Sequence, residues 1–130
     1  MRGVIQNRER AKQIPDFSGM RWGNITPTDL DMGIDFRNGI FVFGEMKLPG
    51  AELPQGQRWF LEHLTDAIAE TGRLSVTFIL EHDTRPTEDI DAAKCLIREL
   101  RSHRRWRKPE LSICAKDAID LILESKGMVF

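Results

Sequence analysis

The chain has 130 residues, 41% of them hydrophobic, which is enough for one globular domain with a hydrophobic core. No apolar run approaches the length of a membrane-spanning helix, and the N-terminal residues lack the apolar block of a signal peptide, so we expect no membrane association. The net charge of −1 gives no general attraction to nucleic acid, so any such attraction must come from a local basic surface.

Several kinds of chemistry are excluded by residues that the sequence lacks. It has no tyrosine and therefore no tyrosine nucleophile. Its histidines are scattered and form no pair at helical spacing, which argues against a histidine-based nuclease or an HExxH hydrolase. It has no glycine-rich phosphate-binding motif. The two cysteines, Cys95 and Cys114, lack metal-ligand spacing, which is typical of a cytoplasmic protein with reduced thiols.

The first predicted element is a short helix over residues 4–14, which Pro15 ends. Its residue of interest is Glu9, which is either a solvated side chain among basic neighbours or a carboxylate available to a nearby site. Residues 16–25 contain Phe17, Met20 and Trp22 and predict a short strand, with the tryptophan in the core.

Residues 31–47 predict a β-hairpin around the turn signal Asn38-Gly39, because apolar and β-branched residues flank it on both sides. If residues 37–39 form a three-residue connection, Asp31 faces Glu45 across the hairpin. If only Asn38-Gly39 turns, Asp31 is a diagonal neighbour of Glu45. Asp35 lies near the turn, too far from Glu45 to share an ion with it.

The open end of this hairpin carries two carboxylates and an ammonium group, on Asp31, Glu45 and Lys47. Strand residues two apart share a face, so Glu45 and Lys47 point the same way. Two carboxylates suit Mg²⁺, which prefers oxygen ligands and keeps part of its hydration. The alternative is a surface salt bridge between Lys47 and either carboxylate.

The next elements are a Pro- and Gly-rich loop over residues 48–54 and a helix from Pro54 to about Thr71, ended by Gly72. Gln57 and Arg58 lie in the first turn of this helix, where a phosphate would be favoured. Its predicted buried stripe consists of Phe60, Leu61, Leu64, Ala67 and Ile68.

Residues 74–81 predict a buried strand from their β-branched and apolar content. Residues 89–101 are compatible with a helix or with a strand that pairs with 74–81, and we favour a strand for the later half. Residues 103–108 predict a basic turn, and residues 112–125 predict a closing helix. The inward side chains of that helix are expected to be Ile113, Ala118, Leu121 and Ile122.

The basic turn contains the side chains that we expect to meet DNA phosphates, together with Arg58. They are Arg104, Arg105, Arg107 and Lys108. The alternative is an ordinary solvated turn, with Trp106 in the core.

The stretches Thr28-Asp29-Leu30-Asp31, Phe43-Gly44-Glu45-Met46-Lys47 and Gly56-Gln57-Arg58 together resemble the PD-(D/E)XK, or restriction-endonuclease-like, nuclease superfamily. The resemblance is strongest to small phage-type members with a TPTDxD…ExK…GQ arrangement, and it covers roughly residues 5–82. Leu30 stands where the family has proline, and Asp29 is a rival to Asp31 for the aspartate role.

The resemblance implies that the site is Asp31, Glu45, Lys47 and Gln57. Asp31, Glu45 and the backbone carbonyl of Met46 would hold Mg²⁺ or Mn²⁺, with Glu9 as a further possible ligand. Lys47 would orient or activate the attacking water, and Gln57 would support the site.

The sequence therefore predicts a single domain over residues 1–130 with a mixed β-sheet, the hairpin at its centre and helices on its faces. The expected function is metal-dependent hydrolysis of DNA phosphodiester bonds in a bacterial or phage-infected cell. Selectivity for DNA structure, as in a Holliday junction resolvase, is expected rather than sequence specificity, with a homodimer as the working unit. The alternative is a catalytically inactive nucleic-acid-binding module on the same scaffold.

Overall fold

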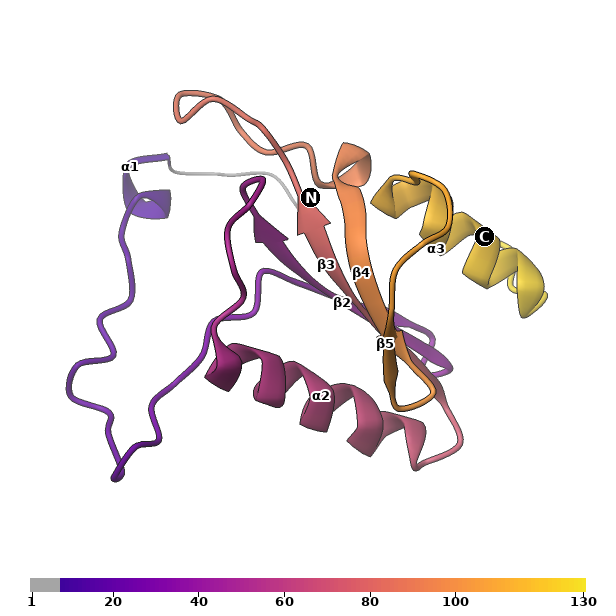
Figure 1. Cartoon of the computed structure of the whole chain (residues 1–130), viewed down its shortest axis with the longest axis horizontal. Coiled ribbons are helices and arrows are strands. Elements are labelled where there is room, and N and C mark those ends of the chain that lie inside the picture. Colours follow the sequence, from indigo (N-terminus) through magenta and orange to yellow (C-terminus); the bar gives the residue numbers. More distant parts are fainter. Residues whose placement is uncertain (1–7) are drawn as a thin grey trace.

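The fold was analysed in a computed structural model, which describes residues 8–130. A mixed sheet of five strands, in the order β1-β2-β3-β4-β5, lies between helices α2 and α3 (Figure 1). The elements in chain order are α1 (Arg8–Ala11), β1 (Met32–Phe36), β2 (Ile40–Lys47), α2 (Gln55–Ala69), β3 (Leu74–Glu81), a 3₁₀ turn η1 (Ala92–Lys94), β4 (Leu96–Ser102), β5 (Arg105–Arg107) and α3 (Ala115–Ser125). The predicted α+β architecture is thus confirmed. Within the described residues, no helix is both long and apolar enough to cross a membrane.

Strand β3 is the centre of the sheet, and the β1–β2 hairpin lies at one edge rather than at the centre. β2 and β3 run parallel, whereas the other neighbouring pairs are antiparallel. The 15-residue helix α2 makes the parallel connection between β2 and β3. Because β2 and β3 are parallel, Lys47 and Glu81 end side by side at the same edge of the sheet.

One face of the sheet carries the apolar core. Val42, Val76 and Phe78 are buried on this face beneath α3, which contributes Ile119 and Leu123. Three of the four predicted inward residues, Ile113, Ala118 and Ile122, are partly buried and pack against this core. Leu121, expected to point inward, is 58% exposed.

The other face of the sheet is more polar and lies against α2. Leu61 and Thr65 are the buried residues of this helix. The Thr65 hydroxyl donates to the Leu61 carbonyl at 2.6 Å and lies 2.5 Å from the Thr77 hydroxyl, while Ser75 donates to the Thr65 carbonyl. These bonds satisfy buried polar groups and fix α2 to β3. Two members of the predicted stripe, Phe60 and Ala67, are exposed instead.

The N-terminal region differs most from the predictions. Of the helix predicted over residues 4–14, the structure has α1 alone, and residues 4–7 lie outside the described part. The strand predicted over residues 16–25 is wrong: Trp22 and Ile25 form an isolated bridge around a tight turn. Trp22 is 63% exposed rather than buried.

The second half of the chain follows the predictions more closely. Strand β3 has the predicted bounds, 74–81, and the strand alternative for the later half of 89–101 is confirmed by β4, which pairs with β3. The predicted basic turn is itself a short hairpin, because Arg105–Arg107 forms β5 on the edge of β4. Both cysteines are free thiols.

Candidate metal and active site

The β1–β2 hairpin has the three-residue connection, because Phe36 pairs with Ile40. Within this connection, Arg37 and Asn38 have positive φ, at 54° and 60°. The Asn38 amide donates to the Asp35 carboxylate at 2.6 Å, which closes the turn and gives Asp35 a structural role. The two strands therefore keep the same pairing register from the turn to the open end of the hairpin.

At this open end, Asp31 and Glu45 lie together. Met32 pairs with Gly44, so the next position of the same register places Asp31 opposite Glu45, on the same face of the sheet. Asp31 Oδ2 accepts a hydrogen bond from the Met46 amide at 2.8 Å, which fixes the aspartate beside β2. The Asp31 carboxylate also acts directly on the Glu45 carboxyl group and raises its pKa. The diagonal alternative for Asp31 is thereby excluded.

Glu45 is a buried carboxyl group, with 3% of its surface exposed. Its pKa is raised to about 8 from an ordinary value of 4.5, first by burial and then by hydrogen bonding with the adjoining Asp31 carboxylate and by charge repulsion from it. The charge of Lys47 and a hydrogen bond with Gln57 act in the opposite direction. Without a cation, Glu45 is therefore protonated at neutral pH.

The oxygen atoms of this cluster suit a hard divalent cation. Glu45 Oε2 and Gln57 Oε1 are buried without a hydrogen-bond partner, and such atoms are costly unless a ligand or an ion satisfies them. Asp31, Glu45 and the Met46 carbonyl would supply oxygen ligands, and Mg²⁺ commonly keeps several waters beside few protein ligands. No three His, Cys, Asp or Glu side chains among residues 8–130 are grouped to hold a metal, and Glu9 is an exposed side chain on α1. The fit therefore depends on Asp31 and Glu45.

Lys47 shares the face of Glu45 at the end of β2 and is half-buried. Its charge acts on Glu45, yet no ion pair within 4.0 Å joins it to a carboxylate in the described part of the chain. The neighbouring Glu81 is paired with Arg98 at 2.5 Å instead. The salt bridge that would be the ordinary explanation for Lys47 is thus absent from residues 8–130, and its ammonium group faces the candidate site without a fixed partner.

Arg98 is a site residue that the sequence did not reveal. It lies at a β-bulge, where Ile79 pairs with Glu99 but Leu80 pairs with Ile97. Its guanidinium group donates to Glu81 at 2.5 Å, to the Ala51 carbonyl at 2.6 Å and to the Leu48 carbonyl at 3.1 Å. Arg98 thereby holds the loop that follows Lys47. A bulge leaves no clear sequence pattern, so this role could be found only from the pairing.

Gln57 and Arg58 occupy the first turn of α2, but their surroundings differ. Gln57 contacts Glu45, as described above. Arg58 forms an ion pair with Glu99 at 2.5 Å and lies 4.8 Å from the ring centre of Trp106. The positive charge of Arg58 is therefore largely balanced within the protein.

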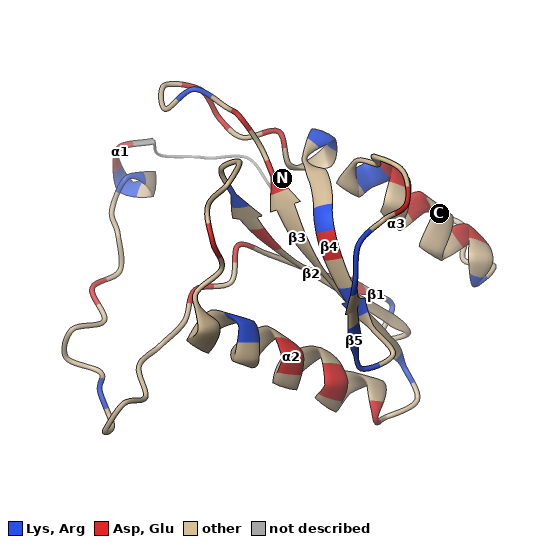
Figure 2. Ribbon diagram, in the orientation of Figure 1, with Lys and Arg blue, Asp and Glu red and all other residues tan. Residues whose placement is uncertain are grey.

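The predicted basic turn lies against an acidic row at helical spacing, formed by Glu62 and Asp66 on α2 and by Glu70 directly after its last residue (Figure 2). The three contacts in this row are Arg101 with Asp66 at 2.7 Å, Arg104 with Glu70, and the Trp106 indole nitrogen with Glu62 at 2.7 Å. Trp106 is half-buried by this contact rather than placed in the apolar core.

The remaining basic side chains of this hairpin are differently placed. Arg107 donates to the Ser102 hydroxyl at 2.6 Å, while Arg105 and Lys108 are exposed. Arg107 is exposed as well, so these three side chains supply the positive charge of the hairpin that no carboxylate of the described residues balances, whereas Arg101 and Arg104 are paired.

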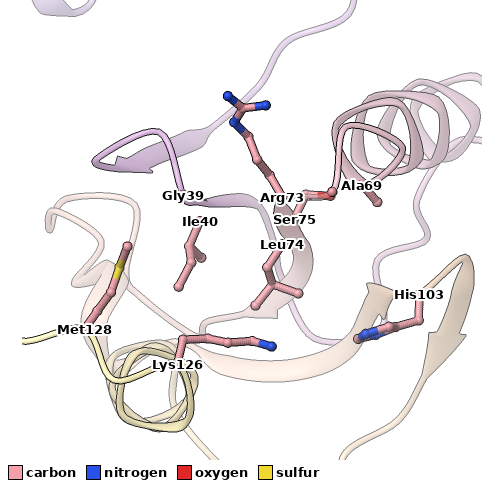
Figure 3. Close-up of a pocket in the computed structure, with 10 residues that line it drawn as sticks. Gly39, Ile40, Ala69, Arg73, Leu74, Ser75, His103, Lys126 and Met128 are labelled. Atoms are coloured by element: carbon pink, nitrogen blue, oxygen red, sulfur yellow. The ribbon is translucent and has the colours of Figure 1, made fainter.

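A pocket of about 440 Å³ lies at the opposite end of the sheet, where β2 and β3 begin (Figure 3). Lys126 and His103 point toward each other across it, whereas the guanidinium group of Arg73 is directed away and its Nε donates to the Asn38 carbonyl at 2.8 Å. Its lining contains no carboxylate side chain, so this pocket is separate from the Asp31–Glu45 site.

Comparison of the chain with protein-family models, with curated proteins and with solved structures finds no match. The findings on this chain thus establish an α+β fold, and the function must be inferred from the site itself.

The raised pKa of Glu45 makes the stability of the metal-free protein depend on pH. Between the ordinary pKa of 4.5 and the folded-state pKa of about 8, the folded protein keeps a proton that the unfolded chain has released. The free energy of unfolding should therefore fall as the pH rises through this range, by at most about 1.4 kcal/mol per pH unit.

Urea denaturation in the presence of a chelator, at several pH values in this range, measures this slope. Glu45→Gln cannot ionise and should remove this component of the slope, so the variant should gain stability relative to the wild type as the pH rises. Parallel pH profiles for the two proteins would contradict the assignment.

Proposed function

We propose that the protein is a metal-dependent deoxyribonuclease that hydrolyses DNA phosphodiester bonds. The observation that carries the proposal is the buried Glu45 carboxyl beside Asp31, with one oxygen left without a partner and an unpaired Lys47 on the same face. A buried glutamate beside an aspartate is costly to ionise, because burial and the like charge both disfavour its carboxylate form. A divalent cation would remove that cost and would make the pair useful.

Each residue then has a chemical role. Asp31, Glu45 and the Met46 carbonyl would hold Mg²⁺ or Mn²⁺, which would supply stabilisation of the charge that grows on the phosphate. Lys47 orients or activates the attacking water, because its ammonium group is free of other partners. Gln57 positions Glu45 through its side chain. Asp29 is exposed and remains a rival to Asp31.

DNA phosphates would be bound by exposed basic side chains, among them Arg105 and Lys108 of the basic hairpin. Arg105 pairs with Ser102 at the end of the sheet opposite to Asp31 and Glu45, so DNA that contacts both would have to extend along the sheet. Arg58, Arg104 and Arg107 could add contacts by exchanging their present partners for phosphate. A domain of 130 residues has little surface for reading a long sequence, which favours recognition of DNA structure. A homodimer would allow paired cuts in a two-fold symmetric junction.

The proposal predicts a strict metal requirement. Purified protein should cut DNA with Mg²⁺ or Mn²⁺ and should stop when chelator is added. Ca²⁺ should bind without supporting turnover, because it is larger and its coordination is looser. The measurement is cleavage of supercoiled, linear, single-stranded and four-way DNA, with Glu45→Gln as the control for a contaminating nuclease. Undiminished cutting in excess chelator, or equal cutting by the variant, would refute the proposal.

A further inference from the structure

A groove of about 830 Å³ lies directly beside the candidate site, between residues 24–29 and the first half of α2. Gln57 lines this groove and also contacts Glu45, so the groove and the carboxylate pair share a side chain. Whatever occupies the groove would therefore lie next to the reacting phosphate of a bound DNA strand.

The walls of the groove combine aromatic rings with neutral polar groups. Trp59 and Phe60 line it from α2 with 55% and 38% of their surface exposed, and Ile25 lines it from the opposite side with 71% exposed. These side chains point outward because Leu61 and Thr65 turn the other side of α2 toward the sheet. Large apolar side chains gathered on a surface mark a binding site.

The charge of the groove indicates what it would bind. Its lining includes Asn24, Thr26, Thr28 and His63 but no lysine or arginine. A phosphate would find no cation there, and the one carboxylate, on Asp29, would repel it. A flat, uncharged and aromatic ring system with hydrogen-bonding edges would instead stack on the indole of Trp59 and bond to the polar groups.

We propose that this groove binds an unpaired nucleobase of the DNA strand that is cut. The inference rests on the proposed nuclease function and adds its substrate class: DNA with a single-stranded stretch beside the scissile phosphate. A base within a duplex cannot enter the groove without leaving its stack, which costs free energy that an already unpaired base does not pay.

The test compares the affinities of two fluorescent DNAs of equal length, one fully paired and one with a single-stranded arm, in chelator so that neither is cut. Wild-type protein should prefer the armed DNA. Trp59→Ala should lower that preference roughly 5- to 150-fold, which corresponds to loss of one base stacked on an aromatic ring. Trp59→Phe should keep most of it. Leu121→Ala, which removes an exposed apolar side chain from α3, is the matched control and should change nothing.

Two results would overturn the inference. The first is an unchanged preference in Trp59→Ala. The second is a change from dimer to monomer in this variant, seen by sedimentation, with the preference intact, which would make the groove an interface between copies of the chain.

Cleavage assays on the same preparations separate the two proposals. Metal-dependent cutting without any preference for unpaired DNA would overturn this inference alone. A preference that depends on Trp59, in a protein that cuts no DNA, would overturn the nuclease function alone. Binding to neither DNA would overturn both.

Discussion

Replacing Lys47 by alanine is expected to lower the rate of DNA cleavage about 10²- to 10⁴-fold, the range typical for loss of a group that handles the proton of a nucleophile. The structure explains why the effect should be so large. Lys47 is half-buried beside Glu45 and has no carboxylate within 4.0 Å in the described residues, so its ammonium group is not part of a salt bridge that merely holds the hairpin. DNA affinity should change little, because a single positive charge next to a bound cation adds little to phosphate binding.

The matched control is Lys116→Ala, which removes an exposed lysine paired with Asp120 on α3. It should leave both rate and affinity unchanged. The measurements are single-turnover cleavage at saturating DNA and fluorescence anisotropy in Ca²⁺. Cleavage by Lys47→Ala at the wild-type rate would show that this end of the hairpin is not the active site.

Asp31→Asn is expected to abolish most activity by a different route, loss of the metal. In the wild type the Met46 amide donates a hydrogen bond to Asp31 Oδ2 at 2.8 Å, and the side-chain oxygen of asparagine can still accept this bond. The local backbone should therefore be kept while the negative charge is lost. Metal affinity should fall by at least about 10- to 100-fold. Loss of a residue that only hydrogen bonds to a metal ligand already has an effect of about this size, and Asp31 is proposed as a ligand itself. Cleavage should fall in parallel and should recover partly at high Mg²⁺ concentration.

Asp29→Asn is the matched control, since Asp29 is the rival carboxylate two residues earlier and is exposed. It should bind metal as the wild type does and should keep metal-dependent cleavage, although Asp29 also lines the proposed base-binding groove. The opposite result, with Asp29→Asn inactive and Asp31→Asn active, would move the aspartate role to Asp29 and would overturn the assignment of Asp31.

Those parts of the fold that follow from local patterns were predictable from the sequence. The run of β-branched and apolar residues in 74–81 has no helical period and is bounded by polar residues, so its strand could be placed to the residue. The hairpin could also be placed, because the turn residues and the flanking apolar residues agree. The alternation of side chains along β1 and β2 then brings Asp31 and Glu45 to one face.

Features that depend on contacts between distant segments were not predictable. The acidic row of Glu62, Asp66 and Glu70 balances basic residues about 35 positions later in the chain, as the separation of Arg101 and Asp66 shows. Composition alone therefore overstated the free charge of the basic hairpin. Thr65 was missed as a core residue because its hydroxyl is satisfied by Thr77 on β3, which only the fold reveals.

The stripe of α3 shows a third limit. Leu121 and Leu123 are equally apolar, and helical spacing allows a stripe through either of them. Packing against β2 and β3 selects Leu123, which is 9% exposed, and leaves Leu121 on the surface.

The central claim is that Glu45 and Asp31 together hold a divalent cation, and calorimetric titration with Mg²⁺ near neutral pH tests it most directly. Repeating the titration in two buffers with different ionisation enthalpies gives the number of protons released on binding. Because the pKa of Glu45 is about 8, the metal must displace its proton, so we predict one bound ion and about one released proton per protein. Glu45→Gln should bind no ion at this site. Absence of binding by the wild type, or equal binding by Glu45→Gln, would contradict the account.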